Sequence, residues 1–112
     1  GRYSSSNGTT GDSVWSTQGT WVMLQGIKDK KKITIGILDH PSNPGYPAYW
    51  HARGYGLFSV NPLGRAIFSK GRESLNLALD PGQSVNFRYT LLVASGHDVG
   101  AADMEKIAKG FN

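Results

Sequence analysis

Residues 39–56, DHPSNPGYPAYWHARGYG, combine an acid, two histidines, an arginine and four aromatic residues, which are side chains that could perform chemistry. Three of the five prolines, two of the three histidines and four of the twelve aromatic residues lie in this one stretch, which sets it apart from the rest of the chain. Imidazole can transfer a proton near neutral pH, guanidinium can hold an anion or a hydroxyl, and an aromatic ring can stack on an apolar ligand face. The stretch is therefore the first candidate for a ligand site.

The segment HARGYGLFSV, residues 51–60, alternates in the way that is typical of a β-strand. The alternation places His51, Arg53 and Tyr55 on one face, at steps of about 6.6 to 6.8 Å. We predict that these three side chains share one hollow of the surface. The alternative is that they form the wet face of an amphipathic strand, in which His51 has a structural role.

Asp39 and His40 end a strand pattern of isoleucines, at the junction with a loop that Pro41, Pro44 and Pro47 stiffen. Such junctions are common positions for site residues. Asp39 also fits a turn role, in which its carboxylate caps backbone amides. A metal site built from Asp39, His40 and His51 has no His-x-His or similar spacing to support it, so we predict no metal and no cofactor.

The rest of the chain predicts the elements that must position these groups. Two apolar runs, at 20–27 and 33–38, flank a lysine-rich loop and predict an antiparallel hairpin. A second hairpin is predicted from 75–79 and 84–93, and its longer strand places Val85, Phe87, Tyr89, Leu91 and Val93 on a single apolar face. Spacing in the tail predicts a short helix that includes Met104, Ile107, Ala108 and Phe111.

These elements together predict an all-β fold, an antiparallel β-sandwich with a short C-terminal helix. Residues 1–13 are rich in Ser, Thr, Gly and Asn and predict a flexible arm or loop, which leaves 14–112 as a single β-sandwich domain.

The absence of cysteine excludes disulfides and thiolate chemistry. No apolar run approaches the roughly twenty residues that span a bilayer. Much of the net charge of +4 lies in Lys28 and 30–32, which we interpret as a solvated loop, so no nucleic-acid partner is predicted.

Three segments resemble a known bacterial family: WVMLQGI, IGILDHPSNPGYPAYWHARGYGLFSVNPLG and LNLALDPGQSVNFRYTLLVASG. The chain resembles the C-terminal half of the family labelled "methane oxygenase PmoA", or PmoA-like. The resemblance implies the galactose-mutarotase-like supersandwich fold, export to the periplasm or the cell exterior, and a place in carbohydrate metabolism. A saccharide or sugar-derived small molecule is then the expected ligand.

For a sugar ligand, the expected catalytic residues are His51 as proton carrier, Asp39 or His40 as its counterpart, and Arg53 as the orienting cation. The expected substrate-binding residues are Tyr46, Tyr49, Trp50 and Tyr55. One alternative is a glycan-binding module without catalysis. A further alternative is a structural half-domain that completes a larger sheet and has no site of its own. In a half-domain of this kind, unpaired strand edges predict a homodimer or pairing with a missing N-terminal half.

Overall fold

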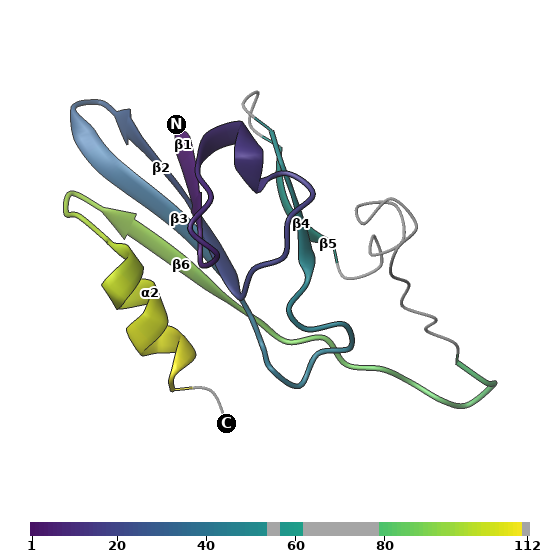
Figure 1. Ribbon diagram of the computed structural model, residues 1–112. Coiled ribbons are helices and arrows are strands. Elements are labelled where there is room, and N and C mark those ends of the chain that lie inside the picture. Colours follow the sequence, from purple (N-terminus) through teal and green to yellow (C-terminus); the bar gives the residue numbers. More distant parts are fainter. Residues whose placement is uncertain (54–56, 62–78, 111–112) are drawn as a thin grey trace.

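The computed structural model describes residues 1–53, 57–61 and 79–110. The described elements are β1 (Arg2–Ser5), the 3-10 helix η1 (Gly11–Val14), β2 (Trp21–Lys28), β3 (Lys31–Asp39), β4 (Tyr49–Ala52), β5 (Phe58–Asn61), β6 (Tyr89–Ser95) and the helix α2 (Ala101–Ala108) (Figure 1). Every pairing among these described strands is antiparallel. The predicted fold class, all-β with a short C-terminal helix, is confirmed. In the described part of the chain, no helix is long and apolar enough to span a membrane.

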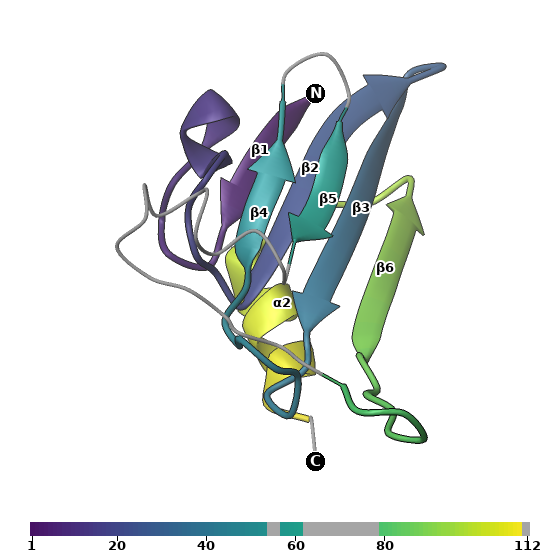
Figure 2. The ribbon, with the colours of Figure 1, turned by 90° about the vertical axis from the view of Figure 1, so that its right-hand side faces the viewer.

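The strands form a four-stranded sheet in the order β1-β2-β3-β6 and a two-stranded sheet of β4 and β5 (Figure 2). The predicted hairpin between residues 20–27 and 33–38 is confirmed as β2 and β3, which run in register from Trp21 opposite Leu38 to Lys28 opposite Lys31. The loop between 40 and 48 contains no strand, as its three prolines predict. It leads from the larger sheet to the smaller one.

Both faces of the larger sheet are covered, one by α2 and the other by the β4-β5 sheet (Figure 1). On the helix side, the buried core consists of Trp21, Met23, Leu38, Ala94, Val99 and Met104. On the other side it consists of Tyr3, Val14, Val22, Trp50 and Ala52. A strand buried on both faces is apolar at successive positions, which explains the apolar run Trp21–Leu24 in the first half of β2.

The N-terminal segment is ordered, which differs from the predicted arm. Arg2–Ser5 forms the edge strand β1, and the buried side chain of Tyr3 belongs to the core. The sequence signal for this strand is weak because Tyr3 is the only apolar residue among its neighbours.

The single strand predicted at 51–60 differs from the structure, in which β4 ends at Ala52 and β5 begins at Phe58.

Strand β6 exposes the apolar face that its alternation predicted. Leu92 packs against the helix-side core, while Leu91 and Val93 are 69% and 72% exposed. The face that the alternation gives to Leu91 and Val93 is therefore the exposed one. The reason is that α2 covers the other side of β6, whereas the β4-β5 sheet leaves this side exposed. The predicted partner strand at 75–79 lies outside the described residues, except for Leu79.

The turn of the β2-β3 hairpin predicts a stabilising substitution. Asp29 and Lys30 both have positive φ, 51° and 64°, as the central residues of a type I′ turn do. A non-glycine residue pays about 1–2 kcal/mol in this region, so we expect Lys30→Gly to raise the free energy of unfolding by about 1 kcal/mol. Thermal unfolding measures the change. Lys31→Gly removes the same charge within a strand and should be destabilising; equal effects of the two variants would contradict the assignment.

Candidate functional site

The outer face of the β4-β5 sheet carries His51 and Arg53. Trp50 and Ala52 of β4 point into the core against the larger sheet, so His51, the residue between them, points to the other face. His51 and Arg53 are both half-buried, and the register places Ser59 of β5 opposite His51. The prediction that His51 and Arg53 share a face agrees with this geometry. Tyr55, the third member of the predicted row, lies outside the described residues.

Trp15 joins His51 and Arg53 from a part of the chain that the sequence did not implicate. The Ser16 amide donates to the Trp50 carbonyl at 2.8 Å, and the Trp50 amide donates to the Thr17 carbonyl at 3.0 Å, so this segment runs beside β4. The Trp15 ring meets the His51 ring edge-on at 6.1 Å between centroids. The guanidinium carbon of Arg53 lies 4.1 Å from the Trp15 ring centroid. We call Trp15, His51 and Arg53 the outer cluster.

The backbone at the end of β4 is held by the N-terminal strand. The Tyr3 hydroxyl lies 2.9 Å from the carbonyl oxygen of Arg53 and 2.7 Å from that of Leu57, so its one O–H group is shared between these two acceptors. The Arg53 amide in turn donates to the Leu57 carbonyl at 2.8 Å. Tyr3 therefore fixes the position of Arg53 from the core side. No periodic pattern in the sequence marks Trp15 or Tyr3, because each is a lone aromatic among polar residues.

Asp39 organises the proline-rich loop from a buried position. Its Oδ1 accepts a hydrogen bond from Asn43 Nδ2 at 2.6 Å, and its Oδ2 accepts one from the Ala48 amide at 3.0 Å. Asn43 also accepts a bond from the Arg88 amide at 2.7 Å and donates to the Arg88 carbonyl at 2.6 Å. These contacts match the turn role that was one of the two alternatives for Asp39. We call Asp39 and Asn43 with their backbone partners the loop clamp.

Burial raises the pKa of Asp39 above its ordinary value of 3.8, although the bonds from Asn43 and Ala48 oppose the shift. Because the folded-state pKa is the higher one, protonation favours the folded state. The resulting stabilisation is complete below about pH 3.8 and is lost as the pH rises through the folded-state pKa. We expect the unfolding free energy of the natural protein, relative to Asp39→Asn, to fall as the pH is raised across this window. Denaturant titrations at several pH values measure it, and a constant difference would contradict the shift.

The other predicted site residues lie apart from the outer cluster or inside the protein. His40 Nδ1 accepts a bond from the Ser42 amide at 3.0 Å, a turn contact. Trp50 is fully buried, and its indole N–H donates to the Gly19 carbonyl at 2.8 Å, so it cannot form an exposed stacking wall. Tyr49 is 8% exposed, and Tyr46 is a half-buried loop residue whose pKa is raised by burial. Asp39, His40 and His51 do not form a group that could hold a metal ion.

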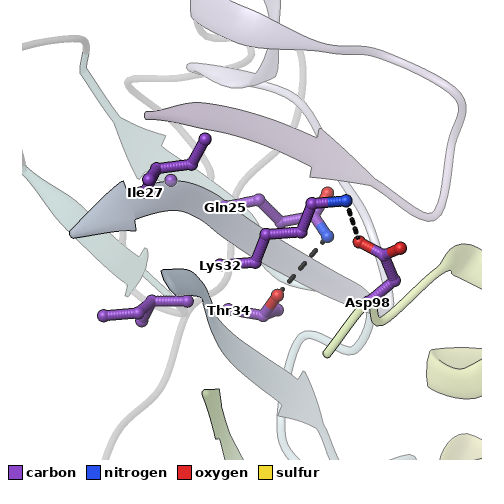
Figure 3. Close-up of a pocket in the computed structure, with 7 residues that line it drawn as sticks. Gln25, Ile27, Lys32, Thr34 and Asp98 are labelled. Atoms are coloured by element: carbon purple, nitrogen blue, oxygen red, sulfur yellow. Dashed lines mark hydrogen bonds and ion pairs between the residues drawn. The ribbon is translucent and has the colours of Figure 1, made fainter. Parts of the chain in front are cut away.

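A separate polar pocket of about 260 Å³ lies on the helix-side face of the larger sheet (Figure 3). Within it Lys32 Nζ and Asp98 Oδ1 form an ion pair at 2.7 Å, and Gln25 Nε2 donates to the Val99 carbonyl at 2.7 Å. The charged and amide groups of this pocket therefore already have hydrogen-bond or ion-pair partners within the protein. The ion pair is exposed, and pairs of this kind contribute about 0–1 kcal/mol. The lining residues are Gln25, Gly26, Ile27, Lys32, Ile33, Thr34 and Asp98.

The fold and the outer cluster define an antiparallel β protein with an aromatic and basic surface on its smaller sheet. Comparison with known proteins gives its family: residues 1–109 match the model of the family of unknown function DUF6807, and the chain belongs to this family. No curated protein and no solved structure matches the chain.

Proposed function

We propose that this protein binds saccharides at the outer cluster of Trp15, His51 and Arg53. The observation that carries the proposal is the position of Arg53, whose guanidinium carbon lies 4.1 Å from the Trp15 ring centroid on a face that also presents His51. Sugar-binding surfaces combine aromatic faces with side chains that donate hydrogen bonds to hydroxyls. The resemblance to the PmoA-like family supports the same ligand class.

Binding without catalysis has more support in the geometry than acid–base chemistry. Asp39, the carboxyl expected to act with His51, accepts hydrogen bonds from Asn43 and Ala48 inside the loop clamp. His40 takes part in a turn with Ser42. A general acid or base must reach the proton that it transfers. We therefore assign the outer cluster a binding role and place no reaction there.

A panel of neutral and acidic oligosaccharides, measured by isothermal titration calorimetry, tests the proposal. We expect at least one member to bind, and we expect Trp15→Ala to weaken that binding about tenfold, because an aromatic contact contributes on the order of 1 kcal/mol. Phe87→Ala removes a half-buried aromatic outside the cluster and should bind as the natural protein does. Absence of binding across the panel, or full binding by Trp15→Ala, would overturn the proposal.

We also propose that the protein self-associates through the edge of β6 that no other described strand pairs with. This strand carries no charged residue, and Leu91 and Val93 extend its apolar surface toward Ile35 of β3. Edge strands of soluble proteins usually carry charges or prolines that block pairing. Antiparallel pairing of two copies would bring Arg88, which precedes β6, near Asp98 of the second copy, so the charges at the two ends are complementary.

Sedimentation equilibrium over a range of concentrations tests this association. We expect Leu91→Lys to weaken it strongly, because the substitution places a charge in the paired edge. Ile27→Lys is the matched control, since Ile27 is 74% exposed but lies on the opposite face of the sheet. A monomer at every concentration, or an equal effect of both substitutions, would show that β6 is not the contact.

A further inference from the structure

We infer that the saccharide bound at the outer cluster is anionic, carrying a carboxylate or a sulfate group, and that Arg53 selects it. This inference rests on the proposed function. It concerns a different property, the charge of the ligand, and it is carried by the orientation and the electrostatic surroundings of Arg53.

The contact with Trp15 restricts how Arg53 can present its hydrogen-bond donors. A guanidinium is planar, and its N–H groups point outward in that plane as a rigid fork. The contact with the Trp15 ring limits the freedom of the group without using those donors. The Tyr3 hydroxyl holds the Arg53 carbonyl, so the backbone below the side chain is also fixed. A fork that is fixed in this way matches the two oxygens of a carboxylate or sulfate.

The electrostatic surroundings of Arg53 favour an anion. Among residues 1–53, 57–61 and 79–110, the single ion pair joins Lys32 to Asp98, and no described acid pairs with Arg53. His51, whose ring meets the same Trp15 ring, adds an imidazole to this face and no acid. A half-buried guanidinium gains more from an anionic partner than from a neutral hydroxyl, because charge-assisted hydrogen bonds are about twice as strong as neutral ones.

Matched pairs of ligands test the charge requirement. Oligomers of galacturonic, glucuronic and mannuronic acid are compared with their methyl esters, which keep the sugar and remove the charge, and sulfated oligosaccharides are compared with their desulfated forms. We expect at least one acidic ligand to bind about tenfold or more tightly than its neutral counterpart. The two arms of the panel distinguish a carboxylate from a sulfate.

Substitution of Arg53 assigns the preference to this residue. Arg53→Gln should reduce the ratio of acidic to neutral affinity to near one, and Arg53→Lys should retain part of it, since lysine keeps the charge but lacks the fork. Lys32→Gln removes one positive charge from the helix-side face of the larger sheet, away from the outer cluster, and should leave the ratio unchanged.

The outcomes separate the two proposals. Equal affinity for acids and esters, with binding that still depends on Trp15, would overturn the inference and leave saccharide binding in place. A preference that survives in Arg53→Gln would also overturn it. Absence of binding by every ligand would overturn both.

Discussion

Asp39→Ala is expected to lower the free energy of unfolding by about 3 kcal/mol, because a buried donor left without its acceptor costs about 1–3 kcal/mol and the substitution orphans two. The Ala48 amide loses its bond of 3.0 Å, and Asn43 Nδ2 loses its bond of 2.6 Å to the carboxylate. Relief of the buried charge recovers part of the loss, since burial already raises the pKa of Asp39. The melting temperature should fall by roughly 10–20 °C.

Thermal and urea unfolding measure this change, and two further variants identify its cause. Asp98→Ala removes an acid whose side chain is 77% exposed and should cost less than about 1 kcal/mol. Asp39→Asn keeps an acceptor for Asn43 but turns an N–H group toward the Ala48 amide, so its loss should lie between the two. If Asp39→Ala unfolded like Asp98→Ala, the loop clamp would have no role in stability.

Trp50→Ala is expected to have the second large effect, a loss of about 3–5 kcal/mol. Trp50 is fully buried between the two sheets, where it packs with Val22 and Tyr3 and donates to the Gly19 carbonyl. The substitution removes both this packing and the partner of that carbonyl. Trp15→Ala should cost much less, since Trp15 is only half-buried. We therefore expect the two tryptophans to have different roles. Trp50 stabilises the fold, and Trp15 contributes to saccharide binding.

Chemical denaturation and saccharide binding, measured on both variants, distinguish these roles. Trp50→Phe is the conservative control and should recover most of the stability, because a large ring again fills the site. Stability of Trp50→Ala within 1 kcal/mol of the natural protein would contradict its position in the core.

Local patterns predicted the parts of the fold in which one period dominates. The hairpin of β2 and β3 and the helix α2 follow from their apolar spacing alone. The orientation of β6 could not be predicted in this way, because its residues 91–94 are all apolar and only tertiary packing decides which of them face α2. The formation of strand β1 likewise depends on a long-range contact, because Tyr3 packs in the core between the two sheets.

The candidate site was predicted in part. The alternation of residues 51–53 indicated a shared face for His51 and Arg53, and the same alternation places Trp50 on the other face, which makes its burial understandable. Trp15 could not be predicted, because it lies 36 positions before His51 and reaches it only through the backbone bonds between Thr17 and Trp50. For Asp39, the sequence is compatible with a role in a ligand site and with a role in stabilising the turn. The hydrogen bonds of its carboxylate in the structure are needed to distinguish these roles.

The loop clamp also bears on the order in which the chain can acquire its structure. The side chain of Asn43 makes two hydrogen bonds to the backbone of Arg88, 45 positions later. It donates one to the Arg88 carbonyl and accepts one from the Arg88 amide. A nascent chain that has left the ribosome only as far as β5 has Asp39 and Asn43 but lacks this partner. The contacts between Asn43 and Arg88, which connect the loop between the two sheets to the segment just before β6, can therefore form only after Arg88 has been synthesised.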